Sequence, residues 1–145
     1  MFNIHSASTL ITLLNTQPVI LEQIRIRNTT TKIGKQIVFT SSHRITITTI
    51  TVQNIPELIL SISKSNVTSI NKLMIENCTQ AMHISDTSIS SISSSTFLNN
   101  GNNQSQSGGA IYMSNSIASI HDSMFMNNTA IDGGAIQFSC ASTNN

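Results

Sequence analysis

Six carboxylates are the residues best able to take part in acid–base or metal chemistry, and their spacing keeps them apart. They are Glu22, Glu57, Glu76, Asp86, Asp122 and Asp132. Cleavage of a polysaccharide in a groove needs acids and a cation that converge, and calcium needs a cluster of oxygen ligands. In the repeat described below, Asp122 shares its column with Ser94 and Lys72, so no second acid stacks beside it. The sequence predicts no catalytic residue, no metal site and no cofactor.

Two histidines stand close to acids in the sequence. His83 precedes Asp86, and His121 is next to Asp122. An imidazole beside a carboxylate is the pairing that general bases and metal ligands use, but it is also common on solvated strand faces. No serine lies in a G-x-S-x-G nucleophile setting. We therefore interpret both pairs as polar surface residues.

A short repeat must position all these side chains. An apolar residue, a variable residue and an asparagine recur five times, with asparagines at Asn28, Asn54, Asn77, Asn99 and Asn127. Five positions before the apolar residue of each copy stands a second apolar residue: Leu21, Ile47, Ile70, Ile92 and Ile120. In the last four copies the residue before that one is hydroxylic: Thr46, Ser69, Ser91 and Ser119. Neighbours of opposite character point to opposite faces of a strand, so the unit is made of strands.

Composition favours the same interpretation. Asn, Ile, Ser and Thr make up over half of the 145 residues, while charged residues are 9 per cent and aromatic residues 4 per cent. Isoleucine and threonine favour strands, and serine and asparagine favour turns. A disordered chain is the alternative, but 39 per cent of the residues are hydrophobic and recur in register.

Two further arms complete each repeat. Alternating apolar pairs recur as Ile37 and Phe39, Leu60 and Ile62, Met82 and Ile84, Ile111 and Met113, and Ile136 and Phe138. Another short arm begins at Ile45, Val67, Ile89 and Ile117. A unit of 22 to 28 residues with several strands and no helical pattern predicts an all-β parallel β-helix, or solenoid, of about five coils with three short strands per coil.

The asparagine column suits a corner of such a coil. Asparagine tolerates the left-handed backbone that a sharp turn needs, and its amide has both donors and an acceptor. We expect the five asparagines to form a buried ladder of amides along the solenoid axis.

The chain is expected to form one β-helix domain over residues 20–145. Residues 1–19 are expected to be a cap or a truncated coil, with Pro18 at the boundary. The repeat runs to the last residues without a cap pattern, which predicts a fragment of a longer array.

The last two repeats carry a more specific pattern. Phe-Leu-Asn-Asn at 97–100 is followed by Gly-Gly-Ala-Ile at 108–111, and Phe-Met-Asn-Asn at 125–128 by Gly-Gly-Ala-Ile at 133–136. Over residues 89–140 this resembles the polymorphic outer membrane protein repeat of chlamydial surface proteins and related protist proteins; the earlier repeats keep only the Ile-x-Asn part. The resemblance implies a right-handed parallel β-helix at a cell surface, adhesive in several members, with host or cell-surface glycans or proteins as partners.

The paired glycines have a structural interpretation of their own. They are Gly108, Gly109, Gly133 and Gly134. Glycine adopts backbone angles closed to other residues and lets one coil approach the next. A phosphate-binding loop would need a following Lys with Ser or Thr, which is missing here.

The remaining signals concern partners and processing. A net charge of +1 predicts no nucleic-acid partner, and no apolar run is long enough to span a bilayer. No signal peptide is recognisable in the first twenty residues. Cys78 and Cys140 lie two coils apart, too far for a disulfide, and both are expected to be buried thiols.

Five glycosylation sequons occur, and their position decides which are usable. Three fall in the asparagine column, where burial would exclude a glycan; Asn66 and Asn103 lie in turns and are the expected acceptors. Asn103 sits in an insertion at 101–107, which is expected to be a contact surface.

Together these signals predict a non-enzymatic surface or extracellular β-helix segment with an adhesive or structural role. The alternative is a fragment of a carbohydrate-active, pectin-lyase-like β-helix enzyme whose groove lies mostly elsewhere.

Overall fold

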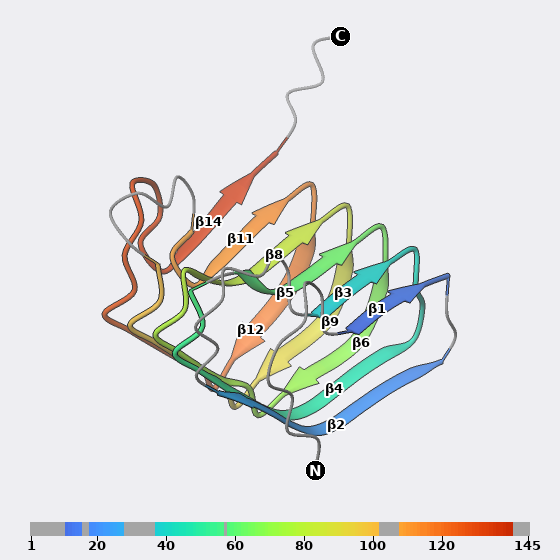
Figure 1. Cartoon of the computed structure of the whole chain (residues 1–145). Helices are drawn as coiled ribbons and strands as arrows, with labels where there is room; N and C mark the ends of the chain where they lie inside the picture. Colours follow the sequence, from blue (N-terminus) through green and yellow to red (C-terminus); the bar gives the residue numbers. More distant parts are fainter. Residues whose placement is uncertain (1–10, 16–17, 28–36, 57, 102–107, 141–145) are drawn as a thin grey trace, which may run out of the picture.

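The computed structural model describes residues 11–15, 18–27, 37–56, 58–101 and 108–140. Every strand pair in this part of the chain is parallel, and no helix occurs in it. Figure 1 shows successive coils stacked along one direction, with the strands of each coil lying on those of the coil before. The predicted all-β parallel solenoid is confirmed.

One sheet of six strands forms the first arm of the coils. Its order follows the chain: β1 (Ile11–Leu14), β3 (Ile37–Thr40), β5 (Leu58–Ser63), β8 (Gln80–Ser85), β11 (Ile111–Ser114) and β14 (Ile136–Ser139). The predicted apolar pairs are register partners throughout, since Ile37 lies opposite Leu60 and Phe39 opposite Ile62. β1 stacks on β3 in the same register, so residues 11–14 belong to the stack.

A second sheet of eight strands forms the other two arms. Its members are β2 (Val19–Arg27), β4 (Ile45–Gln53), β6 (Asn66–Asn71), β7 (Met74–Glu76), β9 (Ser88–Ser93), β10 (Thr96–Leu98), β12 (Ile117–His121) and β13 (Met124–Met126). β2 and β4 are long strands that cover both arms, whereas later coils divide them at a turn, as β6 and β7 do. Three strands per coil is therefore the arrangement of the later coils.

The stack amounts to about four turns. The fifth predicted coil begins at β2 and includes residues 28–36, which lie outside the described part of the chain.

Inward side chains of all three arms form one apolar core. Ile47, Ile70, Ile92 and Phe97 are all fully buried, and the rings of Phe97 and Phe125 stack with centroids 4.9 Å apart. Each such side chain contributes roughly 1.5–3 kcal/mol before the entropy of ordering is subtracted.

β12 begins at Ile117, as predicted for this arm, but Ile117 does not stack on Ile89. In the last coil Ala118, not Ile117, lies opposite Ile89, and Ile117 is 77% exposed. The arm between the corner residue Ser116 and Ile120 has one residue fewer than its counterpart in the coil before, so the register shifts and Ile117 turns outward.

Candidate functional site

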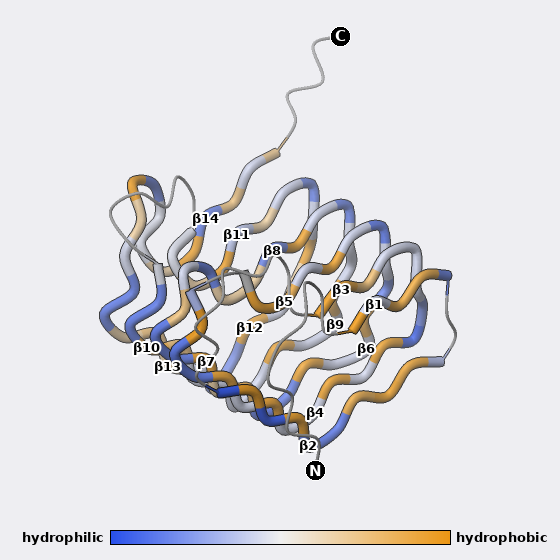
Figure 2. Tube along the Cα trace, in the orientation of Figure 1, coloured by the Kyte–Doolittle hydropathy of each residue, from blue (hydrophilic) through white to orange (hydrophobic). Residues whose placement is uncertain are grey.

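Each described coil turns at three corners, and each corner uses the same two-residue device: the first residue points its side chain outward and the second points its side chain inward. Corner 1 follows the six-stranded sheet, corner 2 separates the second and third arms, and corner 3 follows the third arm. The first residue of the device has a positive φ: Ser41, Lys64, Asp86 and Asn115 at corner 1; Gln23, Thr49, Lys72, Ser94 and Asp122 at corner 2; and Asn54, Asn77, Asn99 and Asn127 at corner 3. Figure 2 shows hydrophilic residues gathered at these turns.

The predicted asparagine column is the outward residue of corner 3. Asn54, Asn77, Asn99 and Asn127 have φ between 53° and 58°, and all four are exposed. Asn77 Nδ2 donates to Asn54 Oδ1 at 2.9 Å, an amide-to-amide bond along the axis. The prediction that these amides are buried is wrong, because a left-handed residue at the tip of a turn points its side chain to solvent. Asn28 lies outside the described residues.

The buried amides stand one residue later. Asn100 is fully buried, its Oδ1 accepts from Cys78 N at 3.1 Å, and its Nδ2 donates to Ile75 O at 2.9 Å. Asn128 repeats this in the next coil, where its Oδ1 accepts from Asn100 N at 2.9 Å and its Nδ2 donates to Phe97 O at 2.9 Å. The sequence did not predict this inward ladder, which uses the second Asn of each Phe-x-Asn-Asn motif.

At corner 1, side-chain hydroxyl groups accept hydrogen bonds from backbone N–H groups of the neighbouring coil. Ser42 N donates to Ser65 Oγ at 3.1 Å, Ser65 N to Thr87 Oγ1 at 3.3 Å, and Thr87 N to Ser116 Oγ at 3.1 Å. Each acceptor hydroxyl donates in turn to the carbonyl two residues before it, as Ser65 Oγ does to Ser63 O at 2.7 Å. The hydroxyls of Ser65, Thr87 and Ser116 therefore each satisfy one donor and one acceptor of the backbone.

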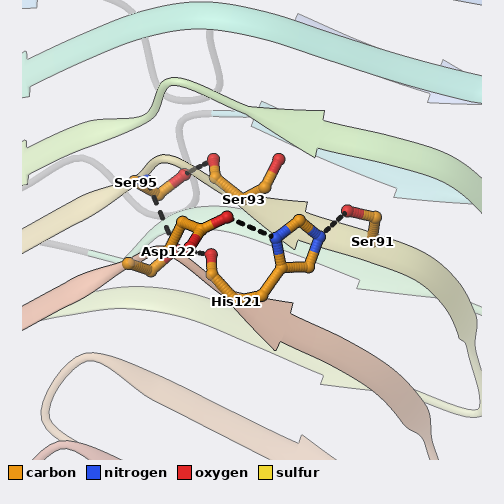
Figure 3. A network of polar contacts seen from close by, with 6 residues as sticks. Ser91, Ser93, Ser95, His121 and Asp122 are labelled. Atoms are coloured by element: carbon orange, nitrogen blue, oxygen red, sulfur yellow. Dashed lines mark hydrogen bonds and ion pairs between the residues drawn. The ribbon is translucent and has the colours of Figure 1, made fainter.

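Corner 2 uses the same kind of bond between coils on its inner side. Its outer side holds the one cluster in the described residues that has the residue types of a catalytic site. Leu73 N donates to Ser95 Oγ and Ser95 N to Ser123 Oγ, both at 3.2 Å. On the outer face of this corner, Ser91 Oγ lies 2.9 Å from His121 Nε2, and His121 Nδ1 lies 3.1 Å from Asp122 Oδ2 (Figure 3).

The strand register explains how these three side chains meet. Because Ile120 of β12 stacks on Ile92 of β9, His121 lies beside Ser93 and reaches back along the outer face to Ser91. The left-handed backbone of Asp122, with φ of 50°, brings its carboxylate to the His121 ring.

The order Ser91, His121, Asp122 is that of a nucleophile, a base and an orienting acid. With the proton on Nδ1, His121 donates to Asp122 and accepts from the Ser91 hydroxyl. Its surroundings are those of a solvated face, because the side chains of His121 and Asp122 are 51% and 82% exposed and water screens their charges. A catalytic serine also needs a free donor for the oxyanion of its substrate. The nearby Ser95 N–H is not free, because it donates to Ser123 Oγ. The three residues act as a polar clip between β9 and β12.

His83 and Asp86, the other pair noted in the sequence, each contact a different residue. His83 packs edge-on against Tyr112 with centroids 5.0 Å apart, and Asp86 Oδ1 accepts from Asn115 Nδ2 at 3.3 Å. In the described part of the chain no group of three or more His, Cys, Asp or Glu is close enough to hold a metal ion.

The predicted glycines lie where the third arm returns to the six-stranded sheet. Gly108 and Gly133 have φ of 50° and 60°. A Cβ at Gly109 would collide with the backbone oxygens of Gly134 and Thr129, whereas a Cβ at Gly134 would meet Asn128 O at 3.1 Å. The backbones of the last two coils therefore touch at Gly109.

Both cysteines are free, and only one is buried. Burial raises the pKa of the Cys78 thiol to about 12, against the lowering effect of a hydrogen bond from the Ile55 backbone. The thiol thus occupies the inward place of corner 3 in its coil. The prediction of a buried thiol is wrong for Cys140, which follows β14 and is exposed.

Exposure of the corner asparagines changes the interpretation of the sequons. Asn66 is exposed at the start of β6, as predicted for an acceptor, but Asn77 and Asn127 are exposed as well. Asn103 and residues 102–107 of the predicted contact insertion lie outside the described residues.

The described residues contain no helix long and apolar enough to cross a membrane. No protein-family model matches the chain, and no curated protein or solved structure matches it either. The likeness of residues 89–140 to the outer membrane protein repeat therefore stays a prediction.

Proposed function

We propose that this chain is a non-catalytic β-solenoid segment that works at a cell surface or outside the cell as a rigid, adhesive scaffold. One observation carries the proposal: the inward polar side chains of the corners bond one coil to the next, as Asn100 does to Cys78 N–H and Ser95 does to Leu73 N–H. Hydrogen bonds between successive coils stiffen the solenoid. The outward side chains remain accessible to binding partners.

The outer face of the second arm exposes hydroxyl groups on two neighbouring strands. Thr68 of β6 and Ser90 of β9 follow the register partners Val67 and Ile89, and both are exposed. Strands of one sheet lie roughly 4.8 Å apart, so β6 and β9 present their hydroxyl groups about one strand spacing apart, whereas β4 and β12 have one residue fewer at this place. Such a surface suits glycans or polar protein segments, and the net charge of +1 gives no general attraction to nucleic acid.

Adhesion of the isolated chain tests the proposal. The chain is fixed to beads, and bead binding to cells and to a panel of immobilised glycans is counted. The double variant Thr68→Arg/Ser90→Arg places bulk and charge on the outer face and should abolish binding without lowering the melting temperature. The control Lys64→Gln changes an exposed corner residue and should bind like the natural chain.

A catalytic role is the competing outcome of the same experiment. Polysaccharides incubated with the chain are analysed for shortened products. Product formation that is lost in His121→Gln would contradict a non-catalytic scaffold, and so would equal bead binding by the natural and the heat-unfolded chain.

A further inference from the structure

A hollow of about 250 Å³ opens on the outer surface at corner 2, between β2 and β4. It is lined by Gln23, Ile24 and Arg25 of β2 and by Thr49 and Thr51 of β4. Gln23 and Thr49 both have left-handed backbones, with φ of 56° and 57°, so the chain bends sharply at one rim of the hollow in both coils.

The lining combines one cation, several hydrogen-bonding groups and one apolar contact. Arg25 brings a planar guanidinium with five donors, Gln23 an amide, and the two threonines a hydroxyl each. Ile24 is half-buried, and its side chain packs against the apolar core. A guanidinium with neighbouring hydroxyls matches the oxygens of a carboxylate or sulfate, which it can hold through two parallel hydrogen bonds.

The register column of Arg25 favours an anion, with the exposed Glu22 three residues earlier on β2 as the neighbouring acid. Arg25 lies opposite Thr51, and the same column continues through Met74, Thr96 and Met124 without an acid. Lys72 stands in the corner 2 column one coil beyond Thr49. Asp122, which contacts His121, belongs to the corner after β12, at the other end of the stack.

We infer that this hollow binds the carboxylate or sulfate group of an acidic saccharide. The anion-binding part follows from Arg25, Thr49 and Thr51. The saccharide part rests on the proposed adhesive function and names the class of glycan that the scaffold would hold.

Two acidic oligosaccharides of equal length, one sulfated and one a uronate, test the inference against a neutral one. Binding to the full chain is followed by calorimetry and by amide NMR shifts. We expect at least one acidic ligand to bind and to shift the amides of Thr49 and Thr51, with the stronger ligand identifying the anion. Arg25→Gln should weaken that binding at least tenfold.

The matched control is Arg44→Gln, which removes the same charge from an exposed residue at corner 1. It should leave the affinity within twofold. Equal weakening by both variants would reduce the effect to general electrostatics and overturn the inference; so would shifts confined to other coils, or no binding of either acidic ligand at millimolar concentration. Thermal unfolding of each variant checks that the fold is kept.

The two proposals fail in different ways. Beads that adhere to cells even when they carry Arg25→Gln, together with no binding of acidic ligands, reject the hollow and leave the scaffold. Acidic ligands that bind at Arg25 while the beads adhere to nothing reject the adhesive function and leave the anion site.

Discussion

Corner 3 is built in two ways within one chain. In the coils of β4 and β7 its inward residue is Ile55 or Cys78, and in the coils of β10 and β13 it is Asn100 or Asn128. The outward residue is an asparagine with positive φ in every one of these coils. The turn is therefore constant, and only the way its interior is filled changes.

Corner 2 changes in the same direction along the chain. Ile50 and Leu73 give way to Ser95 and Ser123, whose hydroxyls accept backbone donors of the coil before. The comparison teaches that a solenoid corner can be closed by apolar packing or by a polar ladder. The polar version requires every inward group to be paired, because an unpaired buried group costs about 1–3 kcal/mol.

The sharpest way to break this comparison is to place an apolar side chain in the polar corner. Asn100→Leu leaves Cys78 N–H and Ile75 C=O without their partner, and we expect the free energy of unfolding to fall by about 4 kcal/mol. Chemical denaturation measures the loss. The control Asn99→Ala changes only the exposed left-handed residue and should cost about 1 kcal/mol. An Asn99→Ala loss as large as that of Asn100→Leu would restore the outward column as the main ladder.

A second test uses the glycines that accompany the polar corners. Gly109→Ala forces the last two coils apart, since its Cβ would overlap Gly134 O, and should cost about 2–3 kcal/mol. A Cβ at Gly134 would come closest to Asn128 O, at 3.1 Å, so Gly134→Ala should cost clearly less, about 1 kcal/mol. The midpoints of urea unfolding give both values. Equal losses would mean that the coils do not touch at this point.

The thiol at the apolar corner makes stability depend on pH. The pKa of Cys78 is raised to about 12 by burial, so its stabilising contribution is complete below the ordinary value of 9.0 and is lost as pH rises toward 12. Between pH 9 and pH 10 we expect a loss of about 1 kcal/mol that is missing from Cys78→Val. A pH profile that is the same for both chains would contradict a buried thiol.

Converting an apolar corner into a polar one should have the smallest effect. In Cys78→Asn the new amide can accept from Ile55 N–H in place of the sulfur, so stability should stay within about 1 kcal/mol of the natural chain. Cys78→Leu gives the matched apolar control. A loss of several kcal/mol for the asparagine alone would show that the two kinds of corner cannot be exchanged.

Most of the fold could be predicted from the sequence because like residues stack at fixed spacing. The columns through Ile47, Ile70 and Ile92 are register partners as expected, and so are the apolar pairs of the six-stranded sheet. Ile117 begins its arm as predicted, but its outward direction could not be read from the sequence, because a single missing residue shifts the register and alternation alone cannot locate that loss.

The polar contacts were harder to predict. In a pair of adjacent asparagines such as Asn99 and Asn100, spacing does not tell which one points inward; only the backbone angle at the turn decides it. The hollow at Arg25 and the contact of Ser91 with His121 each join two coils, so they depend on how neighbouring coils stack.

Amide hydrogen exchange tests the central claim, that the inward ladder bonds one coil to the next, most directly. In Asn100→Ala the Cys78 N–H loses its acceptor, while the Asn77 N–H keeps its bond of 3.0 Å to Leu98 O. We predict that exchange at Cys78 becomes about tenfold faster relative to Asn77. Unchanged protection at Cys78, or the same acceleration at both amides, would contradict the ladder.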